Sequence, residues 1–194
     1  MKTSCVPLED LFEIEHGNKF DYNKMEESES DDDAVVFVNR SGLNNGMVGL
    51  VRRIPTTSPY AAGSITVALG GSALASFVQP KDFYTAQNID VLFPRSPMTD
   101  EVKLYYCLCI EANRYRYSTF GREANRTLRT LLLPRLTEVP QWVHGATFRA
   151  AEAVARDMNT FMDGERRRSN QSAGAAVAVS PSQSMRRVLR KGVP

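Results

Sequence analysis

Residues 65–78, ITVALGGSALASFV, contain two apolar runs on either side of Gly70-Gly71-Ser72. Apolar runs of this length that include β-branched residues favour buried strands, and glycines between two such runs favour a tight turn. The stretch therefore predicts a β-hairpin whose strands are Ile65–Leu69 and Leu74–Val78. Its two glycines lack the spacing of a loop that binds a dinucleotide or a phosphate.

Three more apolar runs lie outward from this hairpin. Residues Ala34–Val38, Met47–Val51 and Ile89–Phe93 are short, apolar and mostly β-branched, so each predicts a buried strand. The segment Asn39–Gly46 joins the first two, and its Asn-Gly end tolerates the positive φ angles of a turn. The first half of the domain is therefore predicted to be rich in β-structure.

Helical patterns flank the strands. Apolar residues within residues 8–17 predict a short amphipathic helix or turn that ends at Gly17. Thr99 is a suitable N-cap for a longer helix, since two acidic residues follow it in the first turn. A second helical piece is predicted over residues 123–130, and a short strand or extended exit over residues 131–134.

The predicted fold class is α+β: a β-rich domain with packed helices, then one further helix and a flexible basic tail. The further helix spans residues 147–162 and has one apolar stripe suited to packing against another helix. The residues of this stripe include Phe148, Ala151, Val154 and Met158. Residues 165–194 are rich in Ser, Ala and Arg, and have little to bury.

The net charge of +2 hides a strong segregation of charge along the chain. Residues 1–33 carry three basic and eleven acidic side chains, whereas residues 165–194 carry seven basic and one acidic. The three cysteines fit neither a disulfide framework nor a zinc site, and no apolar run reaches about 18 residues. We expect a soluble cytoplasmic protein that binds no metal and no cofactor.

Residues 111–131, EANRYRYSTFGREANRTLRTL, contain five arginines among aromatic and amide side chains, with only two acids. Guanidinium groups match phosphate oxygens and guanine edges, and aromatic rings lie against sugars and bases. The segment therefore predicts nucleic-acid binding, although arginines on a solvated surface remain an alternative. The predicted DNA-binding residues here are Arg114, Arg116, Tyr117, Arg122 and Arg126.

A second group of basic and amide side chains occupies the predicted turns beside the strands, where side chains are well placed to contact base edges. This group consists of Arg40, Asn44, Asn45, Arg52 and Arg53, and Tyr60 is predicted to line the same groove as Tyr117. Here too an ordinary turn and plain surface charge remain the alternative.

Catalytic patterns are weak by comparison. Metal-dependent nucleases need a Glu and a Lys two residues apart on one face of a strand, as Glu101 and Lys103 would be beside Asp90. Thr99 instead predicts a helix, which would separate the two side chains by about 200°. Neither His16 nor His144 is placed by the sequence beside a Ser, Cys or Asp partner. The chain is not expected to be an enzyme.

Several short elements together resemble a target-recognition domain of type I restriction–modification specificity subunits, over about Val6 to Thr137. One is the pattern Leu-x-x-Leu-Phe-x-Ile-x-x-Gly, formed by Leu8, Leu11, Phe12, Ile14 and Gly17. The others are a glycine before an Ile-Thr pair (Gly63, Ile65, Thr66), the Gly-Gly hairpin, and a Leu-Pro exit at Leu133-Pro134. Each element is weak alone, and the set is fairly specific.

The resemblance implies a non-catalytic DNA-recognition protein that directs a partner adenine methyltransferase (M) subunit, and possibly a restriction subunit, to its target. Those partners would bring S-adenosylmethionine and magnesium. It implies a target-recognition domain over residues 1–140, a spacer or dimerisation helix over 141–164, and a disordered tail over 165–194. A full specificity subunit has two such domains and this chain has one. The resemblance therefore leaves two alternatives: a half-subunit that dimerises, or pairs with a second half-subunit, through the 147–162 stripe, and a truncated or stand-alone relative. The alternative is a protein-interaction module whose arginines are solvated.

Overall fold

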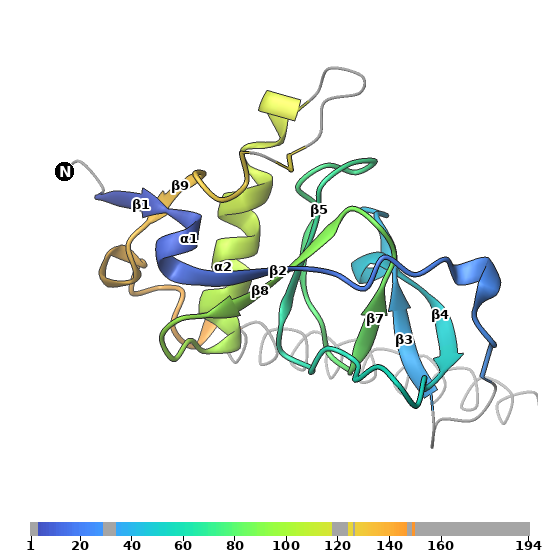
Figure 1. Ribbon diagram of the computed structural model, residues 1–194. Coiled ribbons are helices and arrows are strands. Elements are labelled where there is room, and N and C mark those ends of the chain that lie inside the picture. The colour runs from blue at the N-terminus through green and yellow to red at the C-terminus, as the bar shows by residue number, and fades with distance from the viewer. Residues whose placement is uncertain (1–3, 29–33, 118–123, 126, 147–148, 150–194) are drawn as a thin grey trace, which may run out of the picture. The chain divides into compact units, whose positions relative to one another are not determined.

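The computed structural model describes residues 4–28, 34–117, 124–125, 127–146 and 149 (Figure 1). These residues belong almost entirely to one compact unit, residues 1–145. The predicted helix over 147–162, with its stripe residues Phe148, Ala151, Val154 and Met158, lies outside the described residues apart from Arg149. The basic tail and the predicted contacts Arg122 and Arg126 lie outside them as well.

An antiparallel sheet of four strands runs through this unit in the order β2–β8–β5–β6. These strands are β2 (Phe12–His16), β8 (Ile89–Pro94), β5 (Ile65–Ala68) and β6 (Ser76–Val78). The predicted hairpin is confirmed, because Ile65 pairs with Val78 across β5 and β6. All four residues of β5 are buried, as expected for a strand with a neighbour on each side.

The segment before Gly17 differs from the prediction. Helix α1 (Leu8–Leu11) is a single turn, and β2 begins immediately after it at Phe12. Phe12 and Ile14 are buried while Glu13 and Glu15 are exposed, which is the two-residue period of a strand. The helix prediction was therefore wrong beyond Leu11, since pairing with β8 over the whole length of β2 overrides a spacing that also fits a helix.

A second sheet has three strands in the order β4–β3–β7. Strands β3 (Ala34–Val38) and β4 (Met47–Arg52) are antiparallel and agree with the prediction. The third strand, β7 (Phe83–Thr85), pairs in parallel with β3 and was not predicted. Its three residues are too few to show a periodic pattern. In Figure 1 this sheet lies to one side of β5 and helix α2 to the other.

Helix α2 (Asp100–Glu111) begins after Thr99, as predicted, although the Thr99 side chain makes no capping hydrogen bond. Its buried residues are Val102, Tyr106, Cys107 and Ile110, and they belong to the largest hydrophobic cluster of the described residues. Tyr106 also donates a hydrogen bond from its hydroxyl group to the carbonyl of Pro134 (3.0 Å). The helix is therefore anchored to the core by apolar packing and by one buried polar contact.

The ends of the domain meet in a small sheet. Strand β1 (Cys5–Pro7) pairs antiparallel with β9 (Leu132–Pro134), so the predicted Leu-Pro exit is extended. Between α2 and β9, residues Arg114–Tyr117 form a short 3-10 helix, η4. The described residues within 124–130 form turns, in place of the second helical piece that the sequence predicted. Ala124 and Leu128 there are fully buried, so burial in the core holds these turns.

Candidate nucleic-acid interface

Part of each basic group predicted from the sequence, the loop of Arg40 and the segment of Arg114, lies at the turn between β5 and β6. The backbone N–H of Ser72 in that turn donates to the carbonyl of Arg40 (3.2 Å). A Cβ atom on Gly42 would lie 3.2 Å from the Ser72 hydroxyl oxygen and 3.8 Å from Nη2 of Arg114. The loop that carries Arg40 and the segment that carries Arg114 are therefore neighbours, although they are far apart in the sequence.

The loop of residues 39–46 between β3 and β4, called the Arg40 loop, has a defined conformation. Asn44, Asn45 and Gly46 all have positive φ angles (50°, 52° and 74°), which asparagine and glycine tolerate best. The buried amide of Gln79 donates to the Asn45 carbonyl (2.9 Å), and the Asn44 amide donates to the Met47 carbonyl (3.3 Å). Since Asn44 and Asn45 are exposed, the loop presents them beside Arg40 on a fixed backbone.

The η4 turn presents the second group. Arg114, Tyr115 and Arg116 are exposed and Tyr117 is half-buried. The Arg116 guanidinium lies 5.7 Å from the centre of the Tyr115 ring, and its Nε donates to the Tyr115 hydroxyl (3.2 Å). The Tyr117 hydroxyl is hydrogen-bonded to Oγ1 of Thr127 (2.5 Å). This turn therefore combines cationic and aromatic side chains, the combination suited to phosphates and sugars.

Arg52 and Arg53 do not join this surface. Arg52 pairs with Ala34 at one end of the β3–β4 hairpin, whereas the Arg40 loop follows the opposite end of β3. Arg52 makes an ion pair with Glu26 (2.6 Å), and Arg53 lies 3.8 Å from Asp82. The structure thus divides the second predicted group, and leaves these two arginines next to carboxylates.

Tyr60 also has a different environment from the predicted groove. Its ring lies against Phe83 and Phe93, with centroid distances of 5.6 and 6.1 Å. Its hydroxyl donates to the backbone carbonyl of His16 (3.1 Å). Burial raises the pKa of Tyr60, and the charges of Glu15 and Asp90 add to this. The Tyr60 ring therefore packs against other aromatic rings, and its hydroxyl points toward His16 at the end of β2.

A histidine–aspartate pair, which the sequence analysis missed, lies at this point. His16 and Asp90 are register partners at the ends of β2 and β8, and Nδ1 of His16 lies 2.5 Å from Oδ1 of Asp90. Asp90 is only 1 % exposed, whereas the His16 side chain is 57 % exposed. Burial raises the pKa of Asp90, and the hydrogen bond and charge of His16 act in the opposite direction. The one feature of the sequence that could have indicated this pair is Asp90, an acidic residue within the apolar strand predicted over Ile89–Phe93.

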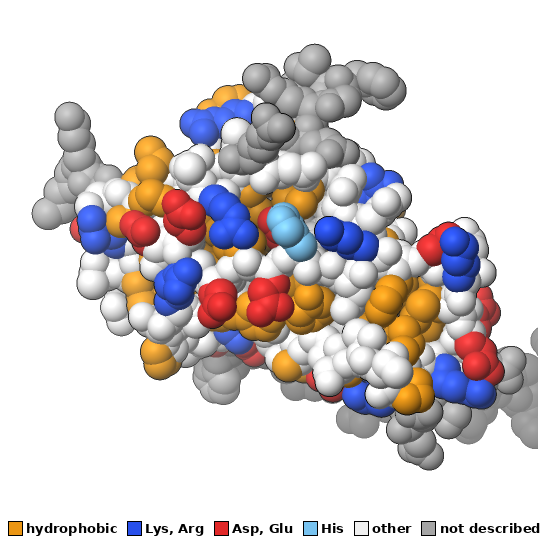
Figure 2. Space-filling model, viewed as in Figure 1, with side chains coloured by type: hydrophobic (Ala, Val, Ile, Leu, Met, Phe, Trp, Pro, Cys, Tyr) orange, Lys and Arg blue, Asp and Glu red, His pale blue; other side chains and the backbone are white. Residues whose placement is uncertain are grey.

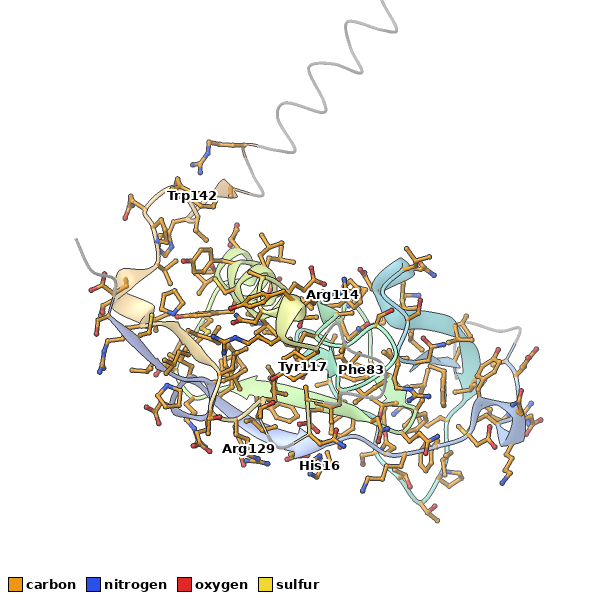
Figure 3. The ribbon with its side chains drawn as sticks, turned by 90° about the horizontal axis from the view of Figure 1, so that it is seen from above. His16, Phe83, Arg114, Tyr117, Arg129 and Trp142 are labelled. Carbon is orange, nitrogen blue, oxygen red and sulfur yellow. The ribbon has the colours of Figure 1, made fainter. Side chains whose placement is uncertain are left out.

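Three concave areas adjoin one another on this part of the domain. The largest has a volume of about 650 Å³ and is lined by Arg40, Lys19 and Gly71 among others. Gly71 also lines a cavity of about 420 Å³ beside Arg114, Tyr115 and Tyr117. Lys19 also lines a third cavity, of about 240 Å³, beside His16. Figure 3 shows Arg114 and Tyr117 on one segment, and His16 beside Arg129.

A family of known proteins matches this chain. The match covers residues 3–131, more than half of the chain, and the family is the type I restriction modification DNA specificity domain. The chain belongs to this family. The resemblance found in the Leu-x-x-Leu-Phe element, the Gly-Gly hairpin and the Leu-Pro exit is thereby confirmed. The name of this family describes a DNA specificity domain and no catalytic activity, which agrees with the sequence prediction.

Solved structures agree with the fold of this specificity domain. The S subunit of a type I restriction–modification system from M. genitalium superposes with a TM-score of 0.56 at 16% identity, over 86% of this chain and 43% of that chain. The HsdS subunit from Thermoanaerobacter tengcongensis has a TM-score of 0.52 at 16% identity, over 80% of this chain and 39% of that chain. A chain from a structure titled for complex assembly of the type I R–M system has a TM-score of 0.56 at 13% identity, over 87% of this chain and 44% of that chain.

The specificity domain covers less than half of the length of each of those three solved chains. No curated protein sequence is significantly similar to it. Within the described part of the chain, no three His, Cys, Asp or Glu side chains are grouped so that they could hold a metal ion. Glu101 and Lys103 lie on helix α2, where Lys103 is bonded to Asp100 (3.0 Å), so the strand geometry of a nuclease centre is not formed. No described helix is long and apolar enough to cross a membrane.

Proposed function

We propose that this specificity domain binds duplex DNA through the surface formed by the Arg40 loop and the η4 turn. The observation that carries the proposal is the close approach of these two segments at the β5–β6 turn, because it joins two separate cationic groups into one surface. Phosphate contacts position such a domain on the duplex, and amide and guanidinium side chains recognise base edges. Asn44 and Asn45 are exposed amides beside Arg40.

The proposal predicts that the full chain binds a random-sequence duplex in dilute buffer, and that affinity falls steeply with added salt. Each phosphate contact contributes a slope of about −0.9 to the plot of log affinity against log salt concentration. Fluorescence anisotropy of a labelled duplex at several salt concentrations measures this slope. No binding at any salt concentration would leave the protein-interaction module as the better function, with the arginines as solvated charge.

We further propose that the domain directs a partner adenine methyltransferase subunit, and in cleavage a restriction subunit, to the target sequence. Support comes from the family of the chain and from its likeness to an S subunit. Deleting the chain from its host is expected to abolish adenine methylation at one set of sequence motifs. Mapping of methylated adenines in the two strains measures this, and an unchanged methylation map contradicts the proposal.

A further inference from the structure

We propose that His16 and Lys19, supported by the buried Asp90, form a second DNA-backbone site, at which they bind a phosphodiester of the duplex held by the Arg40–Arg114 surface. This inference rests on the proposed function and extends the interface to the end of β2. It assigns a ligand to the pair of His16 and Asp90. This pair is not part of the surface formed by the Arg40 loop and η4, called the Arg40–Arg114 surface. It also predicts specific residues whose loss weakens binding.

The cavity beside His16 has the composition of an anion site. Four polar side chains line it, from His16, Lys19, Asn88 and Asn125, and none of the described residues that line it is acidic. The Lys19 ammonium group supplies N–H donors, and a protonated imidazole supplies them as well. A phosphate oxygen accepts such bonds, and bonds from charged donors are the stronger ones. The volume of about 240 Å³ leaves room for a phosphate group.

Asp90 fixes the His16 ring. Its carboxylate is buried and accepts the hydrogen bond of Nδ1, so the remaining ring nitrogen, Nε2, is the one available to a ligand. When a phosphate accepts from Nε2 while Asp90 accepts from Nδ1, both nitrogens donate, and only the protonated imidazolium can do this. Binding of a phosphate at this point therefore requires a charged His16.

The charges around His16 are mixed in sign. The two carboxylates are those of Asp90 on β8 and of Glu15, which precedes His16 on β2. The two cations are Lys19 and Arg129. Nη2 of Arg129 donates to the carbonyl of Ile14 (3.3 Å), which holds this guanidinium beside β2. Figure 2 shows a histidine between two basic side chains along the face that carries β2. His16 therefore lies among cations on a face that also carries carboxylates, and Lys19 is the cation that lines the cavity with it.

The backbone at Lys19 is also unusual. Its φ angle of 62° lies in the left-handed region, which lysine rarely adopts. Such strained residues are concentrated at binding sites. Lys19 lines both the His16 cavity and the larger cavity of Arg40, and Gly71 connects the latter to the cavity of Arg114. The surface that holds the duplex is therefore continuous up to His16.

Two substitutions test the site in the full chain. His16→Asn keeps an N–H donor near the position of Nδ1 and removes Nε2, while Lys19→Asn removes the charge and keeps a residue that tolerates positive φ. We expect each variant to bind a random duplex three- to tenfold more weakly (on the order of one lost phosphate contact) and Lys19→Asn to lower the salt slope by about one. Lys24→Asn is the matched control, since Lys24 is exposed and paired with Asp21.

The pH dependence gives an independent readout. Since the bound form needs a proton on both ring nitrogens of His16, the affinity of the wild type for duplex DNA is expected to fall as the pH is raised. His16→Asn should lose most of this fall, whereas Arg114→Ala should retain it at a lower affinity.

The outcomes separate this inference from the proposed function. A wild type without affinity for duplex DNA overturns both. The second outcome is a wild type that binds duplex DNA and is weakened by Arg40→Ala and Arg114→Ala. If folded His16→Asn and Lys19→Asn then bind as the wild type does, only the His16 site is overturned. In that case His16 and Asp90 are a structural tie between β2 and β8. Near-ultraviolet circular dichroism of each variant confirms that it is folded.

Discussion

The Phe12→Ala variant is expected to lose about 3–5 kcal/mol of its free energy of unfolding. Phe12 is the first residue of β2, is fully buried, and lies edge-on to Tyr106 with centroids 5.5 Å apart and an interplanar angle of 88°. The ring thus joins the four-stranded sheet to helix α2 within the largest cluster. Its removal leaves a cavity, and also loses an aromatic pair that contributes about 0.5–1.5 kcal/mol beyond burial.

Urea denaturation followed by circular dichroism measures this change. Leu104→Ala is a suitable control on the same helix that Phe12 contacts, because Leu104 is 45 % exposed. Substitutions at the surface usually change stability by less than about 0.5 kcal/mol. Equal losses in the two variants would contradict the role of Phe12 as the link between the sheet and α2. Since Tyr117 of η4 packs against this cluster, a reduced DNA affinity at temperatures near unfolding is also expected.

The double variant Arg40→Ala/Arg114→Ala is expected to bind duplex DNA about a hundredfold more weakly than the wild type, or about tenfold for each arginine. A hydrogen bond to a charged group contributes about 1.5–3 kcal/mol, and about 1.4 kcal/mol corresponds to a factor of ten in affinity. Loss of two phosphate contacts should also reduce the salt slope by about two. The effect arises because Arg40 and Arg114 both lie around the β5–β6 turn.

The matched control is Arg52→Ala/Arg53→Ala, which removes the same charge from a different part of the domain. These arginines lie at the opposite end of β3 and beside Glu26 and Asp82, so a much smaller loss of affinity is expected. Anisotropy titrations at matched salt compare the two double variants. Equal losses would show that net charge, rather than the Arg40–Arg114 surface, determines binding.

The strands and the longer helix could be predicted from local patterns. The hairpin at residues 65–78, the strand at 34–38 and the helix after Thr99 each have a periodicity or a terminal signal that local sterics and burial translate into structure. The family could also be identified from short elements between residues 6 and 137, and the match over residues 3–131 agrees with it. In these parts of the chain, local preference and tertiary environment favour the same conformation.

The candidate site was predicted as a set of residue types, but its assembly was not. The sequence indicated the cationic character of residues 111–131 and of the Arg40 loop. It gave no sign that Arg114 lies beside Gly42, or that Arg52 and Arg53 lie at the far end of a hairpin. The pairing of His16 with Asp90, across 74 positions of the chain, was likewise invisible. Such contacts follow from strand order and register, which a local pattern does not specify.

Local patterns in the chain thus specify which residues are apolar enough to be buried, where turns are permitted, and which side chains carry the charge. The folded domain adds that residues 12–16 are a strand, that residues 83–85 complete a second sheet, and which cations lie together. This division arises because burial and turn preferences act over a few residues. Backbone pairing between β2 and β8 or between β3 and β7 is instead satisfied by partners far along the chain.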